Sequence, residues 1–178
     1  SQFNHPHIVN YKHNFIQDDL LFIVMEYCSR GSLRDMIERE DISNFIWKWM
    51  VTLTETLKIV HDKKIIHHDI KPDNILLTAD RIIKISDFGV ANTNSETRAY
   101  LSPEAFDREI DSKNDVRVDI YALGVTLLEL LTGKNPFEDK NLNEILDIHE
   151  KKSFGITKLP NWQQEIILKA ISKIPEQR

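Results

Sequence analysis

Two dense polar segments, separated by a pair of short apolar runs, constrain this chain more than any other feature. The first segment is His67-His68-Asp69-Ile70-Lys71-Pro72-Asp73-Asn74, and the second, Asp87-Phe88-Gly89, begins thirteen positions after Asn74. The pattern rests on seven of these positions, and each of their residue types occurs about once in twenty residues. Chance assembly at one fixed spacing is negligible in so short a chain. The pattern therefore indicates a site built from both segments.

The residues between the two segments predict a short β-hairpin. Ile75-Leu76-Leu77 and the run from Ile82 to Ser86 favour strands, and Thr78-Ala79-Asp80-Arg81 between them favours a turn. A hairpin that closes at this turn folds the chain back on itself, so Asp87 returns beside Asn74. Two groups that are distant in sequence then become neighbours able to share a cation.

Apolar patterns elsewhere predict strands first and helices afterwards. The runs from Ile8 to Phe15 and from Leu20 to Met25 are separated by Gln17-Asp18-Asp19, which indicates an antiparallel hairpin. This order of elements, with the second hairpin set into the helical part, predicts an α+β fold. Helices are expected over Leu33–Arg39, Ser43–His61, Asp119–Thr132, Asn141–Lys151 and Trp162–Lys173.

Two of these helices have informative sequences. The helix from Ser43 has an apolar stripe at residues 46, 49, 50, 53, 57 and 60, with Ser43 as its expected N-cap. The helix from Asp119 to Thr132 is apolar almost all round, so it should be buried, and Gly133 should end it.

Composition excludes several classes of partner. The 178 residues carry a net charge of −5, so no broad basic field exists to hold nucleic acid or an anionic membrane. The longest apolar stretch, Ile120 to Leu131, contains Glu129 and is too short to span a bilayer. Cys28 is the only cysteine, which favours an intracellular, reducing compartment such as the cytoplasm.

The polar segments carry side chains suited to phosphoryl transfer. Asn74 and Asp87 offer hard oxygen donors for Mg²⁺, whose coordination is usually completed by water and substrate phosphates. Asp69 could accept a proton from an incoming hydroxyl or orient it, and Lys71 could neutralise charge on the transferred group. Phosphoryl transfer requires mostly this positioning and charge neutralisation. The alternative is a solvated polar loop before a structural hairpin, which each residue alone would favour.

These segments resemble the catalytic loop and the metal-binding triplet of eukaryotic protein kinases, and the similarity extends over all 178 residues. Ser102-Pro103-Glu104 stands where that family has Ala-Pro-Glu, and Arg178 falls where the ion-pair partner of Glu104 is expected. Asp119 with Gly124 matches the start of the buried helix of the large lobe. Lys71 after Asp69, with Thr97 before Tyr100, is similar to the serine/threonine branch.

The resemblance implies a role for individual residues. Asp69 would be the catalytic base, Lys71 would contact phosphate, and Asn74 and Asp87 would hold Mg²⁺. Residues 26–28, and in particular Glu26 and Cys28, would form the hinge that contacts the adenine of ATP, with Leu76 as the floor beneath it. His67 and Phe88 would stack with Tyr11. The acceptor would be a serine or threonine hydroxyl of a protein substrate.

The resemblance also implies an organisation into lobes. Residues 1–28 would be the last strands and hinge of a small lobe, and residues 29–178 a mainly helical large lobe. The five glycines make no Gly-x-Gly phosphate loop, and no strand lysine or helix glutamate partner for it is found, so the sequence looks like a kinase domain cut at both ends. We therefore expect weak affinity for ATP, an exposed sheet edge that self-associates, and a possible regulatory partner that covers the incomplete small lobe.

His68 stands where the family usually has an arginine that pairs with a phosphate on the following segment. Regulation by phosphorylation of Thr93, Ser95 or Thr97 could then be weak or pH-sensitive, because a histidine is only partly charged near neutrality. A neutral, hydrogen-bonded histidine without a switching role is an equal alternative.

Two other functions stay open at this point. A catalytically inactive kinase-like scaffold would account for the nucleotide-binding residues that are not found, whereas Asp69, Lys71, Asn74 and Asp87 favour activity. A small-molecule kinase of related fold has a similar Asp…Asn…Asp arrangement, but Ser102-Pro103-Glu104 favours a protein substrate.

Overall fold

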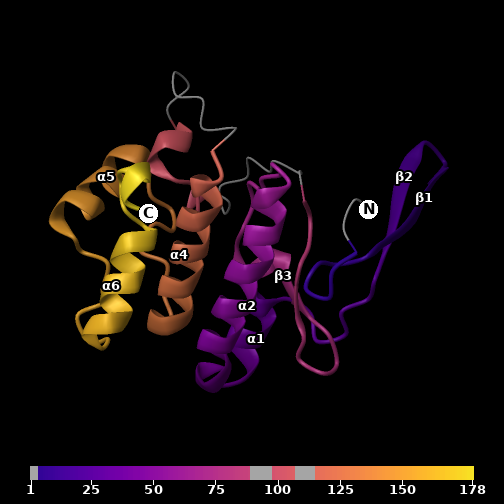
Figure 1. Cartoon of the computed structure of the whole chain (residues 1–178), viewed down its shortest axis with the longest axis horizontal. Helices are drawn as coiled ribbons and strands as arrows, with labels where there is room; N and C mark the ends of the chain where they lie inside the picture. Colours follow the sequence, from indigo (N-terminus) through magenta and orange to yellow (C-terminus); the bar gives the residue numbers. More distant parts are fainter. Residues whose placement is uncertain (1–3, 89–97, 107–114) are drawn as a thin grey trace.

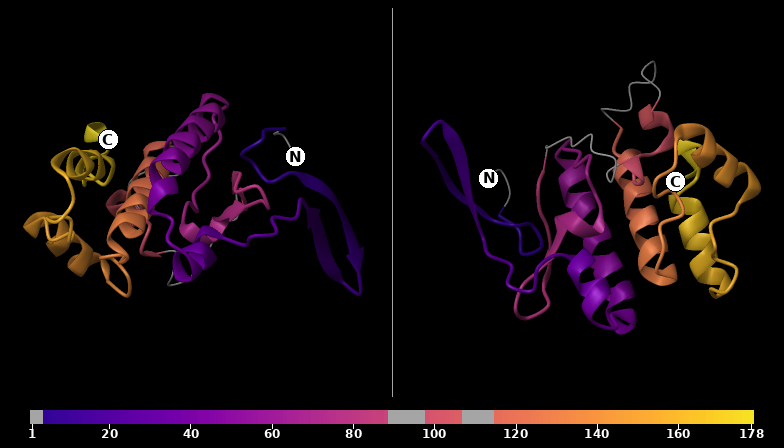
Figure 2. Two further views of the ribbon diagram at one scale, coloured as in Figure 1. Left: turned by 90° about the horizontal axis from the view of Figure 1, so that it is seen from below. Right: turned by 180° about the vertical axis from the view of Figure 1, so that it is seen from behind.

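A two-stranded hairpin extends from one end of the molecule, and a helical body makes up the rest (Figures 1 and 2). The computed structural model describes residues 4–88, 98–106 and 115–178. Within these residues the strands precede most of the helices, as the sequence predicted, and the α+β class is confirmed. None of the described helices has the length and apolar character needed to cross a membrane.

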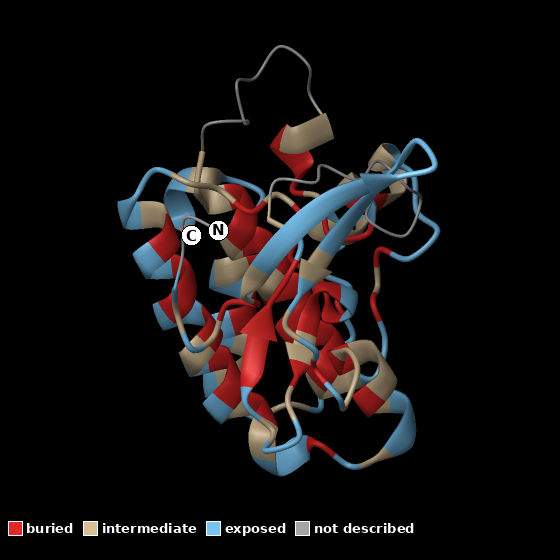
Figure 3. Cartoon of the chain, turned by 90° about the vertical axis from the view of Figure 1, so that its right-hand side faces the viewer, coloured by how far each residue is buried: buried red, intermediate tan, exposed pale blue. Residues whose placement is uncertain are grey.

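The extending hairpin consists of β1 (Tyr11–Gln17) and β2 (Leu20–Met25), which pair antiparallel. Asp18 and Asp19 have φ angles of 50° and 59°, the left-handed conformation that a tight two-residue hairpin turn requires at both positions. The predicted hairpin is therefore confirmed, although its first strand begins later than expected. Ile8 instead forms a parallel bridge with Ile85. Most side chains of β1 and β2 are exposed, on both faces of the hairpin (Figure 3).

The second hairpin consists of β3 (Ile75–Leu77) and β4 (Ile83–Ile85), which pair in the register Ile75 with Ile85 and Leu77 with Ile83. It confirms the predicted turn at residues 78–81. The N-terminal segment runs along β4, because Ile85 N donates to His7 O at 2.9 Å and Val9 N donates to Ile85 O at 2.9 Å. This hairpin is buried, in contrast to β1–β2.

The first helices follow the apolar pattern closely. α1 (Leu33–Arg39) begins at a capping box in which Ser32 and Asp35 exchange hydrogen bonds. α2 (Ser43–Asp62) buries all six residues of its predicted apolar stripe. The prediction that Ser43 is the N-cap is wrong by one residue: Ile42 occupies that position, and Asp41 Oδ1 accepts from Ser43 N at 2.9 Å.

Helices α2, α4 and α6 pack side by side in that order (Figure 1). α4 (Arg117–Thr132) is buried along most of its length and ends at Gly133, whose φ of 74° permits the left-handed cap, as predicted. α5 (Leu142–Lys151) begins at an Asn141 capping box. α6 (Asn161–Ala170) stops short of the predicted Lys173. The described residues also form the short 3₁₀ helices η1 (Pro72–Asn74), η2 (Pro103–Phe106) and η4 (Pro175–Gln177).

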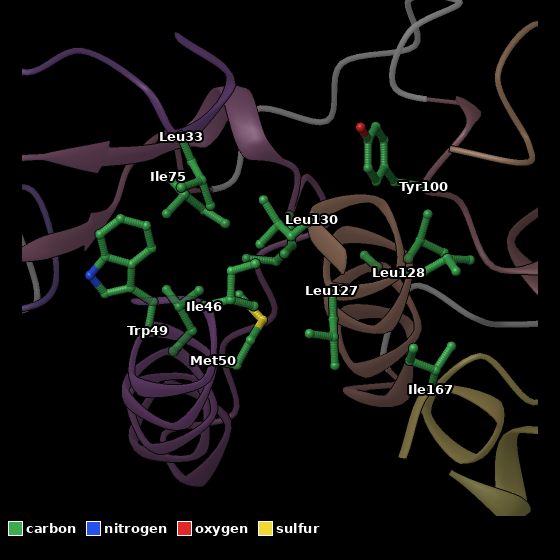
Figure 4. Close-up of a cluster of buried hydrophobic side chains, with 14 of the residues drawn as sticks. Leu33, Ile46, Trp49, Met50, Ile75, Tyr100, Leu127, Leu128, Leu130 and Ile167 are labelled. Atoms are coloured by element: carbon green, nitrogen blue, oxygen red, sulfur yellow. The ribbon is translucent and has the colours of Figure 1, made fainter. Parts of the chain in front are cut away.

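The hydrophobic core lies between α2, α4 and β3 (Figure 4). Ile46 and Met50 of α2 face Leu127 of α4, while Ile75 of β3 and Leu33 of α1 close one side. The predicted polar segments sit at the edge of this core, because η1 leads directly into β3. A rigid apolar framework therefore holds the residues that the sequence singled out.

Candidate active site

The loop before η1 is anchored by one buried carboxylate. Asp119, at the start of α4 and 1% exposed, accepts hydrogen bonds from His67 N at 2.8 Å and from His68 N at 2.9 Å. His61 of α2 donates a third, through Nε2 at 2.8 Å. Burial alone would raise the pKa of Asp119, but these three donors outweigh it and hold the pKa below its ordinary value. Sequence reasoning placed Asp119 on the helix but missed this role.

His67 connects the loop to the second polar segment. Its ring is fully buried, and Nε2 lies 2.7 Å from Ser86 O, while Nδ1 accepts from Asp69 N at 3.2 Å. The proton therefore lies on Nε2. Burial lowers the pKa of His67 and keeps the ring neutral. The ring meets Phe88 edge-on with 4.5 Å between centroids, as expected, whereas the place of Tyr11 in this stack stays a prediction.

Lys71 and Asn74 both lie close to the carboxylate of Asp69. Asn74 Nδ2 donates to both Asp69 O and Asp69 Oδ2, each at 2.8 Å. Asp69 Oδ1 is buried and accepts no hydrogen bond from the described residues, although Lys71 Nζ lies 3.4 Å away. A buried acceptor is rarely left in this state without a reason. Beside this ion pair, Oδ1 retains the capacity to accept a hydrogen bond from a donor that is not among the described residues.

Ser86 joins Asn74 to Asp87 at the end of the hairpin. Ser86 N donates to Asn74 O at 2.9 Å, and the Ser86 hydroxyl lies 3.0 Å from Asn74 O and 3.2 Å from Asp87 Oδ2. The hairpin thus returns Asp87 to the side of Asn74, as predicted. Asp87 adopts a φ of 60°, a left-handed conformation that non-glycine residues seldom adopt outside special sites.

Asn74 and Asp87 could bind a metal ion whose remaining ligands are water and substrate phosphate. Because Asn74 Nδ2 is committed to Asp69, Asn74 Oδ1 is the amide atom left for a metal, and Asp87 is exposed beside it. No cluster of three or more His, Cys, Asp or Glu side chains suited to a metal occurs within residues 4–88, 98–106 and 115–178. This donor set suits Mg²⁺, which is commonly held by one or two carboxylates together with water and phosphate.

The residues expected to contact adenine lie on the β3–β4 hairpin or are connected to it. Glu26 Oε2 lies 3.0 Å from Lys84 Nζ, and Lys84 stands opposite Leu76 in the β-ladder. Cys28 O accepts from Gly31 N at 3.1 Å, and Gly31 O in turn accepts from Leu77 N at 2.9 Å. Cys28 is buried, and burial raises the pKa of its thiol. Glu26, Cys28 and Leu76 are thus tied to one hairpin, while their contact with adenine stays a prediction.

The ion pair expected between Glu104 and Arg178 is present. Arg178 binds Glu104 through both oxygens, at 2.5 and 2.8 Å, with both side chains almost fully buried. Burial would raise the pKa of Glu104, but the Arg178 guanidinium holds it below its usual value.

For some residues the structure does not test the role that the sequence predicted. Gly89 and the hydroxyls of Thr93, Ser95 and Thr97 lie outside the described residues. His68 adopts a φ of 68° and donates its backbone N–H to Asp119. Its proposed switching role stays a prediction.

Comparison with known proteins places this geometry in a wider context. The sequence matches the family described as Protein kinase domain over residues 1–178. It is 39% identical to serine/threonine-protein kinase Nek1 of Mus musculus over 80% of the chain and 13% of that protein, and 38% identical to Nek5 of Mus musculus over 82% and 25%. It is 30% identical to CBL-interacting serine/threonine-protein kinase 10 of Arabidopsis thaliana over 98% and 39%. The chain thus spans well under half the length of these relatives.

Proposed function

The chain belongs to the protein kinase family, and from this premise we propose that it transfers the γ-phosphoryl group of ATP to a serine or threonine hydroxyl of a protein. Within this proposal, residues 1–28 act as the last part of a small lobe with its hinge, and residues 29–178 act as the large lobe. The carboxylate of Asp69 carries the proposal, because its Oδ1 makes no hydrogen bond within the described residues and its Oδ2 binds Asn74, which Ser86 joins to Asp87.

Each residue has a distinct task in the proposed reaction. Asp69 Oδ1 accepts the hydrogen bond of the acceptor hydroxyl and orients it. It takes the hydroxyl proton as the oxygen bonds to the γ-phosphorus and the bond from that phosphorus to the β–γ bridging oxygen breaks, which releases ADP. Lys71, 3.4 Å from that oxygen, offsets the negative charge that gathers on the transferred group. Asn74 fixes the rotamer of Asp69 through its two hydrogen bonds, so the base is held in place before substrate arrives.

Asn74 Oδ1 and the Asp87 carboxylate are the residues that would hold Mg²⁺, whose charge would neutralise the phosphates of bound ATP. Ser86 keeps these two ligands together by lying within hydrogen-bond distance of both residues. The backbone of residues 26–28 and the side chain of Leu76 would receive the adenine ring.

The names of the relatives support a protein substrate. All three are called serine/threonine-protein kinases, and the matched regions include the segments of Asp69 and Asp87 in a chain that aligns over 80% or more of its length. The proposal includes a protein as substrate and a regulatory partner that covers the exposed β1–β2 hairpin.

Two readouts on the same variants test the proposal. Binding of a ribose-labelled fluorescent ATP analogue is titrated with Mg²⁺ and with EDTA, and phosphate transfer to a serine peptide is followed by mass spectrometry. Asp69→Asn should retain nucleotide binding and lose transfer by roughly a hundredfold or more, because it removes the proton acceptor. Asp87→Asn should weaken the Mg²⁺-dependent part of binding.

Asp80→Asn is the matched control, since Asp80 is an exposed residue of the turn between β3 and β4. It should change neither readout. Transfer by Asp69→Asn at the rate of the unmodified chain would refute the assignment of the base, and Mg²⁺-independent nucleotide binding would refute the assignment of Asn74 and Asp87.

A further inference from the structure

A nearly buried lysine connects β4 to the segment expected to contact adenine. Lys84 is the central residue of β4, and its side chain is only 10% exposed. Lysine is seldom buried to this degree without a partner of opposite charge. Within the described residues that partner is Glu26, whose Oε2 lies 3.0 Å from Lys84 Nζ. Lys84 also stands opposite Leu76 in the β-ladder, so the ion pair starts on the face of the hairpin that carries the predicted floor beneath adenine.

The carboxylate of Glu26 joins three segments of the chain. Its Oε2 also accepts from Asn10 N at 3.2 Å, and the Glu26 N–H donates to Asn10 O at 2.8 Å. Burial alone would raise the pKa of Glu26, but Lys84 and the Asn10 N–H outweigh it and hold the pKa below its ordinary value. Glu26 is therefore charged near neutrality, and it connects the segment before β1, the residue after β2, and β4.

The predicted hinge is attached to the β3–β4 hairpin at both of its ends. At the far end, Arg30 N donates to Leu77 O at 3.1 Å, and Leu77 N donates to Gly31 O at 2.9 Å, so this part follows β3. At the near end, Glu26 is attached to β4 through Lys84. The backbone between these points, to which we assign adenine binding, is therefore held from both sides.

We propose that Lys84 positions the hinge backbone for adenine through its ion pair with Glu26. The inference rests on the proposed function, because it takes residues 26–28 as the adenine-binding segment. Lys84 is a positioning residue, since it acts through Glu26 rather than on the nucleotide itself. Its effect is separate from that of the metal ligands, because Asp87 is joined to Asn74 through the hydroxyl of Ser86.

Adenosine has no phosphate, so its binding to the intact chain tests the adenine subsite alone. Its dissociation constant is measured by displacement of the fluorescent ATP analogue, and the gain in ATP affinity on adding Mg²⁺ is measured beside it. Lys84→Met should weaken adenosine binding roughly threefold to tenfold, because a smaller fraction of the chain then has the hinge in place. The Mg²⁺-dependent gain should stay the same, whereas a general disturbance of β4 would reach Asp87 and reduce it.

A double-mutant cycle tests whether the effect belongs to the ion pair. Glu26→Gln should weaken adenosine binding to a similar extent, and Lys84→Met in that background should add nothing. Lys58→Met is the matched control and should change neither readout, because Lys58 forms an exposed pair with Asp62 on α2. Unchanged adenosine affinity in Lys84→Met, additive losses in the cycle, or a reduced Mg²⁺-dependent gain would each overturn the proposal.

The only cysteine of the chain reports on the hinge without any nucleotide. Cys28 is 8% exposed, and its reaction with an aromatic disulfide reagent should be roughly threefold faster or more in Lys84→Met, because a loosened hinge opens more often. Burial and the charge of Glu26 raise the pKa of this thiol, whereas Lys84 lowers it. Removal of Lys84 without hinge opening would therefore slow the reaction, so a faster rate reports opening.

Gly124→Ala is the control for general destabilisation, because its added Cβ would meet Ala170, away from the hinge segment. It should leave the labelling rate of Cys28 unchanged. An unchanged or slower rate in Lys84→Met, or an equal rise in Gly124→Ala, would overturn the proposal even if the unmodified chain transfers phosphate. Faster labelling of Lys84→Met alone, with no adenosine binding to the unmodified chain, would support the connection between Lys84 and the hinge and count against the kinase assignment.

Discussion

Asp119→Asn should destabilise the fold by about 3 kcal/mol, because one carboxylate serves three donors. The asparagine can still accept one of the two backbone N–H groups, His67 N or His68 N, but its NH₂ must face the other. A lost hydrogen bond to a charged group costs about 1.5–3 kcal/mol, and the retained bond becomes a neutral and weaker one. The expected loss is a large part of the stability of a typical domain, about 5–15 kcal/mol.

Urea unfolding followed by tryptophan fluorescence measures this loss. Asp62→Asn is the control: Asp62 forms an exposed i,i+4 pair with Lys58, so its replacement should change stability by no more than about 0.5 kcal/mol. A loss below about 1 kcal/mol for Asp119→Asn, comparable with the control, would refute the idea that this carboxylate anchors the loop.

The same variant has a defined dependence on pH. The pKa of Asp119 is lower in the folded protein than its ordinary value of about 3.9, so its contribution to stability is present above that value and is lost as pH falls through the folded pKa. The difference in unfolding free energy between the unmodified chain and Asp119→Asn should therefore shrink on acidification below about pH 4. A difference that grew on acidification would contradict the depressed pKa.

Two further predictions concern packing and the exposed hairpin. Gly124→Ala should lower the free energy of unfolding by about 1–2 kcal/mol despite the better helix propensity of alanine. The new Cβ would lie 2.7 Å from Ala170 Cβ and 2.9 Å from Ile171 Cγ2, which is too close. A raised melting temperature would contradict this prediction. Ile16 and Leu21 form a cross-strand pair on the exposed hairpin, 74% and 63% exposed. The double variant Ile16→Lys/Leu21→Glu should reduce self-association measured by light scattering and change the free energy of unfolding by less than about 0.5 kcal/mol, whereas the control Leu168→Lys on α6 should not reduce self-association. Unchanged scattering of the double variant would count against the hairpin as the associating surface.

The sequence predicted those parts of the fold that depend on local periodicity. The stripe of α2 was identified because a 3.6-residue repeat is visible within one segment, and the turn at residues 78–81 because a polar segment separates two apolar runs. Helix caps were predicted less well: the N-cap of α2 is Ile42, one residue before the predicted Ser43, and the acceptor for Ser43 N is Asp41, outside the helix.

The long-range polar contacts of the site could be predicted only in part from the sequence. The return of Asp87 to Asn74 could be predicted, since the hairpin between them enforces it. The bonds from His67 and His68 to Asp119 could not, because they join positions more than fifty residues apart and nothing in a sequence marks which backbone N–H lacks an acceptor. An acidic residue at the head of an otherwise apolar helix was the one available signal.

The structure gives the two intervals within the site different tolerances to insertion and deletion. The interval from Asp69 to Asn74 is held rigidly, since one amide group spans both the main-chain and side-chain oxygens of the aspartate. The interval from Asn74 to Asp87 contains a solvent-exposed turn, whose length could drift in evolution without disturbing the ladder beneath it. Searches for distant members of this lineage should therefore fix the first distance and leave the second one variable.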